Sequence, residues 1–191
     1  MEYNLTCPVS KEDLAVLRAG DRVFLSGIVY TARDAAHKRM MELLDQGKDL
    51  PFPLPGSAIY YVGPTPEKPG CVIGSAGPTT SGRMDSYSPR LLDLGQSIMI
   101  GKGARNHAVC EAICRNGAVY LAAIGGAGAL MAGCIKNAEI ICWEDLGCEA
   151  VRRLEVENMP LTVIIDSLGG NLYESGPKAY LASLKRHSEN A

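Results

Sequence analysis

Short apolar runs alternate with amphipathic segments along most of this chain. The runs are rich in valine, isoleucine and tyrosine and are bounded by glycine and proline, a pattern typical of buried strands. Strands are predicted at residues 22–30, 58–62, 71–73, 97–100, 118–124, 138–143, 151–156 and 161–166. Because helical segments separate many of them, the pattern favours an α/β fold with a largely parallel central sheet covered by helices. The strands near the N-terminus lack helices between them, which predicts a second, smaller sheet.

Helix start signals precede several amphipathic segments. Thr31 stands three residues before Asp34, which is the signature of a helix N-cap, and the helix is expected to run to about Gln46. Ser10 begins another helix in the same way. Further helices are predicted at residues 88–94, 107–115, from about 127, at 144–147 and at 177–187, and irregular proline-rich connections at 47–56 and 63–70.

Residues 117–135 contain no charged side chain and are long enough to cross a bilayer. Three glycines, Gly125, Gly126 and Gly128, interrupt the middle of this run. We therefore predict an apolar strand, a glycine turn and a short buried helix instead of a membrane span. Continuous apolar strands of this kind are usual in sheets that are covered on both faces.

Length and composition fit one globular domain. The 191 residues can bury a sizeable core, and we expect one domain with a short N-terminal lead-in at residues 1–9. A net charge of −2 gives no broadly basic surface for nucleic acid. The seven cysteines are odd in number and scattered, and no signal peptide precedes them, which predicts a reducing, cytoplasmic setting.

Two of the cysteines, Cys110 and Cys114, lie four residues apart on a predicted helix and share one face. A metal site needs further ligands nearby, and His107 is the one candidate. We expect small buried thiols here and no metal bound by this chain.

Candidate chemistry begins in the glycine-containing segment at residues 77–83, which we call the threonine loop. Its two glycines allow the backbone to approach a ligand closely. It also carries Thr79 and Thr80, whose hydroxyls can pass a proton, and Arg83, which can hold a carboxylate with two parallel hydrogen bonds. Taken alone, the segment is equally consistent with a plain strand–turn–helix connection.

Two further cations follow predicted strands and precede predicted helices. Arg33 stands in the first turn of a helix, and Lys102, flanked by glycines, follows the strand at 97–100. The plainer interpretations stay open, namely a solvated arginine that pairs with Asp34 or a neighbour, and a lysine in solvent. The lysine does not belong to a nucleotide-binding P-loop, since no hydroxyl follows it. His37, one turn beyond Arg33, is expected to make a local hydrogen bond on the helix face.

Arg33, Arg83 and Lys102 are expected to gather at the carboxyl ends of strands, where α/β sheets bind ligands. Three cations and two threonine hydroxyls suit a small dicarboxylate. The three histidines occupy no evident catalytic setting, and the chain has neither a paired-carboxylate motif nor a cofactor fingerprint. The predicted site is therefore half of an active site.

Four motifs are similar to the β subunit of class I, iron–sulfur fumarate hydratases and to the related β subunit of L(+)-tartrate dehydratase. They are Thr31-Ala32-Arg33-Asp34-Ala35-Ala36-His37-Lys38-Arg39, Gly77-Pro78-Thr79-Thr80-Ser81-Gly82-Arg83-Met84-Asp85-Ser86-Tyr87, Gly101-Lys102-Gly103 and Trp143-Glu144-Asp145-Leu146-Gly147. The likeness runs from about Leu14 to Tyr173 in the family's order. The Gly82-Arg83-Met84-Asp85 form resembles fumarase more than tartrate dehydratase.

The resemblance implies a swivelling β/β/α domain and an active site between this chain and an α subunit. That partner would carry a [4Fe–4S] cluster on three cysteines of its own, and the open iron would bind the substrate hydroxyl and carboxylate. Contacts between copies of this chain are also expected, without nucleic acid or membrane as partners.

The resemblance also implies roles for individual residues. Substrate binding would fall to Arg33, Thr80, Arg83, Lys102 and Gly103. Thr79 would take part in proton transfer, together with an aspartate of the partner. Asn106 departs from the family, which commonly has serine or threonine there, although an amide can still donate or accept a hydrogen bond.

The expectation is a cytoplasmic β subunit that interconverts fumarate and L-malate by reversible trans addition of water. Two alternatives stay open. One is the same chemistry on tartrate or another small hydroxy-diacid, and the other is a domain that binds carboxylates without catalysis.

Overall fold

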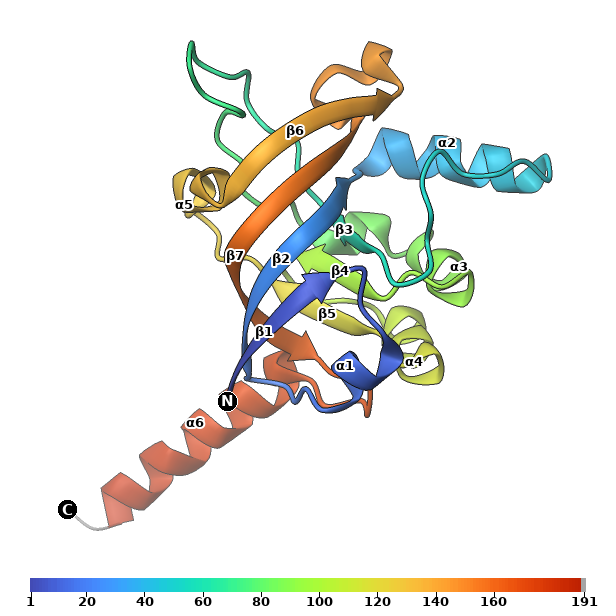
Figure 1. Cartoon of the computed structure of the whole chain (residues 1–191). Coiled ribbons are helices and arrows are strands. Elements are labelled where there is room, and N and C mark those ends of the chain that lie inside the picture. The colour runs from blue at the N-terminus through green and yellow to red at the C-terminus, as the bar shows by residue number, and fades with distance from the viewer. Residues whose placement is uncertain (190–191) are drawn as a thin grey trace.

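The computed structural model describes the backbone of residues 1–189 and the side chains of residues 1–183. In this part of the chain, seven strands form one sheet in the order β1-β2-β3-β4-β5-β7-β6, with β2 also paired to β7 (Figure 1). The strands are β1 (Glu2–Cys7), β2 (Arg22–Thr31), β3 (Ala58–Tyr60), β4 (Ile98–Gly101), β5 (Val119–Ala122), β6 (Ile135–Cys142) and β7 (Val151–Ile165). Strands β1 to β5 run parallel, whereas β7 is antiparallel to β2, β5 and β6. The fold is therefore mixed α/β.

The pairing of β2 with β7 closes strands β2, β3, β4, β5 and β7 into a ring. One side of β2 pairs with β7, and the other side pairs first with β1 and then with β3. Side chains alternate between the two faces of each strand. Tyr60 belongs to the cluster inside the ring, while its neighbours Ile59 and Tyr61 belong to the cluster on the outer face.

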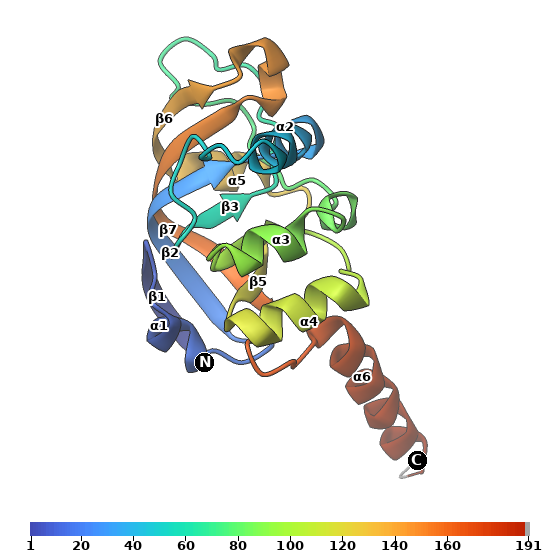
Figure 2. The same ribbon diagram turned by 90° about the vertical axis from the view of Figure 1, so that its right-hand side faces the viewer.

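Helices α2 (Asp34–Asp45), α3 (Ser88–Asp93) and α4 (His107–Asn116) cover that outer face (Figure 2). The other helical elements are α1 (Lys11–Ala15), α5 (Gly128–Gly133), α6 (Leu172–Glu189) and the two 3-10 segments η1 (Ser81–Met84) and η2 (Glu144–Glu149). The predicted helices in these regions are thus present. Helix α6 begins at Leu172, five residues before its predicted start at Pro177, which lies inside the helix.

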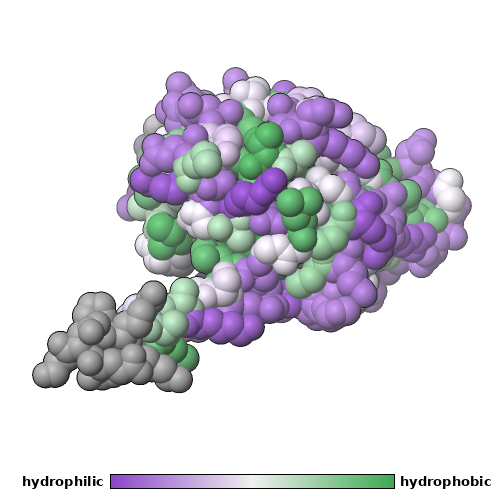
Figure 3. All heavy atoms as spheres, turned by 90° about the horizontal axis from the view of Figure 1, so that it is seen from below, coloured by the Kyte–Doolittle hydropathy of each residue, from purple (hydrophilic) through white to green (hydrophobic). Residues whose placement is uncertain are grey.

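Helix α6 leaves the body of the molecule (Figures 1 and 2) and exposes Tyr180 and Leu181. On the side seen in Figure 3, apolar patches are small and separated by polar ones. The uncharged run at residues 117–135 divides into β5, a glycine turn and α5, as predicted. Helix α5 was expected to be buried, but it buries only Gly128 and Met131 and leaves Leu130 exposed. Within the described chain, no helix combines the length and the hydropathy that crossing a bilayer requires.

Strand β1 pairs with β2 along its length and buries Leu5 and Cys7, so residues 2–7 belong to the sheet. Two predictions about the sheet are wrong. The strands predicted at 151–156 and 161–166 form one strand, β7, in which a bulge accommodates Asn158 at φ +50°. Consequently the described residues form no second sheet, since β7 joins the N-terminal strands to the rest.

Candidate functional site

The threonine loop (residues 77–83) lies at the carboxyl edge of β3 and β4. The Thr79 N–H donates to the carbonyl oxygen of Tyr61, and the Ser81 N–H donates to that of Lys102, each at 2.8 Å. These hydrogen bonds continue the sheet beyond the ends of both strands. They place the loop directly beside the segment that follows β4.

Residues 71–73, predicted as a strand that leads into this loop, form a bend instead. Strands β2 and β4 already occupy both sides of β3, so a further strand has no place to pair there. The loop is supported from another direction, because the Ala76 N–H donates to the Gly128 carbonyl oxygen at the start of α5 (3.0 Å).

Lys102 follows β4 directly and its side chain is exposed. It extends over Gly125, where an added Cβ would lie 4.0 Å from Nζ. In the described part of the chain, no carboxylate pairs with its ammonium group. The next residue, Gly103, has φ +84°, and its peptide groups are bound by the hydroxyls of Tyr120 (2.9 Å) and Tyr173 (3.2 Å). The lysine is thus an available cation on a fixed backbone.

Arg33 is the N-cap of α2 and does not lie in its first turn. Thr31, predicted as that cap, is the last residue of β2. Its hydroxyl donates to the Ala150 carbonyl oxygen (3.3 Å) and accepts from the Arg152 N–H (2.9 Å). The backbone at the start of β7 thus occupies the Thr31 hydroxyl, which is not available to cap α2.

The Arg33 side chain points toward Glu149 at the end of η2. Its Nη2 lies 3.4 Å from Glu149 Oε1, and Glu149 Oε2 accepts from the Ala35 N–H at 2.8 Å. Glu149 therefore serves two functions, since it orients the arginine and satisfies a free N–H in the first turn of α2. Gly63 leaves room for the arginine, because an added Cβ there would lie 2.5 Å from Arg33 Nη1.

Asp34 brings Arg33 and Arg83 together. Arg83 Nε donates to Asp34 Oδ1 at 2.8 Å, while Arg33 Nε lies 3.9 Å from Asp34 Oδ2. Arg33 Nε and Asp34 Oδ2 are both buried and make no hydrogen bond within the described chain. Arg33 and Asp34 are therefore close enough for an ion pair but too far apart for a hydrogen bond.

His37 is buried on the inner side of α2. Its Nδ1–H donates to the Arg33 carbonyl oxygen at 2.8 Å, and its ring packs against Tyr61 and Tyr87. Burial lowers the pKa of His37 from 6.5 to about 4, so the ring is neutral at pH 7. The prediction of a local hydrogen bond is confirmed, and that bond restrains the backbone of Arg33.

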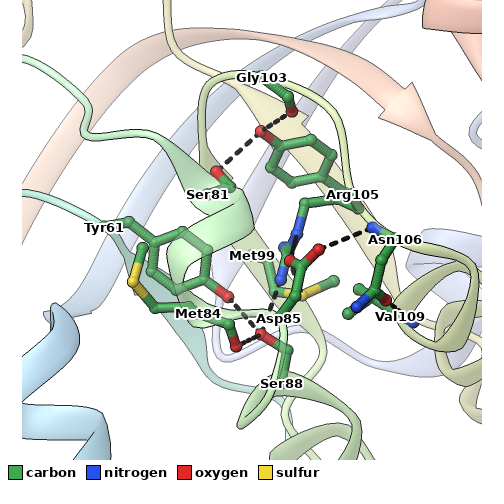
Figure 4. A network of polar contacts seen from close by, with 11 residues as sticks. Tyr61, Ser81, Met84, Asp85, Ser88, Met99, Gly103, Arg105, Asn106 and Val109 are labelled. Atoms are coloured by element: carbon green, nitrogen blue, oxygen red, sulfur yellow. Dashed lines mark hydrogen bonds and ion pairs between the residues drawn. The ribbon is translucent and has the colours of Figure 1, made fainter.

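A buried polar network joins the end of the threonine loop to the segment that follows β4 (Figure 4). Asp85, directly after η1, accepts from Arg105 Nε (2.6 Å) and from the Asn106 N–H (2.7 Å). Arg105 Nη2 donates to the Ser88 hydroxyl at 2.7 Å, and its guanidinium is fully buried. No motif in the sequence predicts a role for Asp85 or Arg105, although both stand within three residues of a predicted substrate-binding cation.

Asn106 is the N-cap of α4, and its Oδ1 accepts from the Val109 N–H at 3.0 Å. Serine, threonine and asparagine all perform this function well. The departure from the family at this position therefore preserves a helix cap.

Metal-ligating side chains do not converge in this part of the chain. His107 and Glu111 are exposed on α4, where Cys110 and Cys114 lie on the neighbouring turns, and burial raises the pKa of both thiols. Among the described residues, no three histidine, cysteine or acidic groups are placed to hold one ion. The side chain of His187 lies outside the described residues.

The predicted site residues thus form two cationic arms at one edge of the sheet. Arg33 and Arg83 meet at Asp34, and Lys102 is tied to the threonine loop, whose residues connect the two arms. Arg83 is about half exposed and Lys102 is exposed, so the arms form an open surface. Such a surface can hold two carboxylates. Thr79 is half-buried and belongs to the threonine loop, which connects the two arms.

A sequence profile of the family described as "Fumarase C-terminus" matches residues 1–176. "Fumarate hydratase 1, mitochondrial" of Leishmania major is 39% identical over 176 residues, which are 91% of this chain and 32% of that protein. "Fumarate hydratase class I, anaerobic" of Escherichia coli is 40% identical over 169 residues, 86% of this chain and 31% of that protein. The chain belongs to the Fumarase C-terminus family.

A different kind of relative is "Putative L(+)-tartrate dehydratase subunit beta" of Methanocaldococcus jannaschii. It is 41% identical over 180 residues, which cover 91% of this chain and 92% of that protein. The chain thus spans about a third of the length of the fumarate hydratases that it matches and nearly all of this smaller relative.

Proposed function

We propose that this chain is the β subunit of a heteromeric iron–sulfur hydro-lyase that interconverts fumarate and L-malate. The observation that carries the proposal is the pair of cationic arms on an open edge, in a member of the Fumarase C-terminus family. An α subunit covers this edge and completes the site. The complex is cytoplasmic, and copies of this chain also contact one another.

In this proposal Arg33, Arg83 and Lys102 bind the two substrate carboxylates, with Thr80 and Gly103 beside them. Asp34 and Glu149 hold the arginines in place before substrate arrives. Thr79, together with an aspartate of the partner, moves the proton at the substrate carbon next to the one that receives the hydroxyl. Threonine is a weak base, so the neighbouring cations favour its alkoxide or it relays the proton.

An iron–sulfur cluster does not fit the scattered cysteines of this chain, because a cluster needs several thiolates together. The proposal therefore assigns the [4Fe–4S] group to three cysteines of the α subunit. When bound, its open iron supplies a Lewis acid for the substrate hydroxyl and carboxylate. This chain, with its closed sheet, acts as a swivelling β/β/α domain against that subunit.

Anaerobic fumarate hydration tests the proposal, with this chain assayed alone and after mixing with its cluster-loaded α subunit. We expect activity only in the mixture, and we expect Thr79→Ala to abolish turnover while the chain stays folded by circular dichroism. Activity of the chain alone, or an active Thr79→Ala complex, would contradict the proposal.

Tartrate is the second candidate substrate, because the relative of matching length is named as a tartrate dehydratase subunit. Comparing turnover of fumarate, L-malate, tartrate and methylated diacids by the assembled enzyme separates these candidates. A carboxylate-binding domain without catalysis would give diacid binding and no turnover with any of them.

A further inference from the structure

We propose that the buried Asp85–Arg105 pair is a positioning element, which sets the spacing between the threonine loop and Lys102. This inference rests on the function proposed above. Asp85 lies two residues after Arg83, and Arg105 lies three residues after Lys102. Each partner of the pair is therefore attached to one arm of the site.

The loops that carry the arms also meet near the surface. The Ser81 N–H donates to the Lys102 carbonyl oxygen, and the Tyr120 hydroxyl contacts Ser81 Oγ (2.9 Å) and donates to the Gly103 carbonyl oxygen (2.9 Å). Arg83 is held by Asp34 on one side. On the other side of Arg83, Asp85 is joined to Arg105, so that the pair holds the residues that follow each cation.

The Asp85–Arg105 pair has the geometry for this function (Figure 4). One carboxylate oxygen accepts from Arg105 Nε, and the other accepts from the Asn106 N–H. The guanidinium lies against the rings of Tyr61 and Tyr120, at 5.4 and 5.2 Å from their centroids. A planar group held in this way fixes orientation as well as distance, which a lysine ammonium group cannot do.

Stability alone is a poor explanation for the pair. Removing two charges from water is costly, and apolar residues of similar volume often stabilise a fold equally well. The hydrogen bonds of Asp85 instead link the end of η1 to the residue that caps α4. The pair therefore joins the two loops at one point, which apolar packing would do less specifically.

The test uses Arg105→Lys, which keeps the positive charge but loses the planar fork, and Asp85→Asn, which keeps the shape. Leu14→Ala is the matched control, because Leu14 is fully buried in the other core cluster. Hydrogen exchange of the Ser81 and Asn106 amides is measured on the full chain. Steady-state kinetics are measured on the complex with the α subunit, with kcat and KM resolved.

We expect both variants to accelerate exchange at Ser81 and Asn106 by about tenfold, and Leu14→Ala to leave these amides unchanged relative to the rest of the chain. In the complex, kcat/KM should fall about 100-fold for Arg105→Lys, as expected for a misplacement of about 1 Å. The double variant should lose no more than either single variant, because the two residues act as one unit.

Three results would overturn the inference. These are unchanged exchange at Ser81 in Arg105→Lys, losses that add in the double variant, and a fall in kcat/KM that Leu14→Ala reproduces at equal loss of stability. If the wild-type mixture has no hydro-lyase activity, the proposed function fails, and the exchange measurements still decide whether the pair positions the loops.

Discussion

Gly101, the last residue of β4, is the position where a single methyl group should disturb the site most. A Cβ added there would lie 2.0 Å from Ser81 Oγ, 3.0 Å from Tyr61 Cδ2 and 3.3 Å from Ser81 Cβ. Ordinary carbon contacts lie at 3.5–4.0 Å, as a rough guide. Gly101→Ala therefore forces the threonine loop away from the segment that carries Lys102.

The cost can be worked from these contacts. Rotation of the Ser81 side chain relieves the closest approach, but it breaks the hydrogen bond to the Tyr120 hydroxyl. Overpacking of a core costs about 1–3 kcal/mol, and a lost hydrogen bond costs about 1 kcal/mol. We therefore expect Gly101→Ala to lower the free energy of unfolding by about 2–4 kcal/mol.

Urea unfolding of the wild-type chain, Gly101→Ala, Ser81→Ala and the double variant checks this reasoning. Ser81→Ala alone should cost about 1 kcal/mol, because it removes the hydrogen bond to Tyr120. The double variant should be more stable than Gly101→Ala, because the 2.0 Å contact is gone. A Gly101→Ala chain within about 0.5 kcal/mol of the wild type, or the absence of rescue, would refute the reasoning.

Three further changes have expected outcomes. Gly63→Ala should displace Arg33 and raise the KM for the diacid about tenfold in the assembled enzyme, at nearly unchanged stability. Asn106→Ala should lower the free energy of unfolding by about 1 kcal/mol, as urea unfolding can measure, while Asn106→Ser should keep the cap. His37 has a folded pKa of about 4, below its ordinary value of 6.5. The unfolded chain therefore binds the proton first, and the free energy of unfolding should fall by about 3 kcal/mol between pH 6.5 and 4. Urea unfolding across this pH range should show a smaller fall for His37→Phe.

The sequence predicts well the elements that are specified locally. Strand β4 and helix α4 follow from an apolar run, a capping residue and Gly117 at the end of the helix. Because parallel strands end at one edge, the placement of Arg33 and Lys102 at the same edge of the sheet could also be predicted. Strand β7 could not, since Asn158 and Pro160 resemble a turn and only the pairing with β2 keeps them in the strand.

The supporting contacts of the site could not be predicted, because they join residues far apart in sequence. Asp85 and Arg105 are 20 residues apart, and no periodicity links them. Glu149 contacts Ala35 at the start of α2, and the two residues are 114 positions apart in the sequence. The available signal was indirect, namely an acid close to a predicted cation. The cap at Asn106 is a local contact, and it could have been predicted from the expected start of α4 and the preference for asparagine at N-caps.

The pairing of β2 with β7 also determines the order in which the molecule can be completed during synthesis. Strand β2 leaves the ribosome well before β7, because strands β3 to β6 come between them in the chain. Until β7 emerges, one edge of β2 has no partner and the apolar residues of the ring interior are exposed to water. Contacts between such distant segments are slow to form and leave intermediates prone to aggregation. The ring therefore closes only after β7 has been made, and the partly folded chain is exposed to aggregation until then.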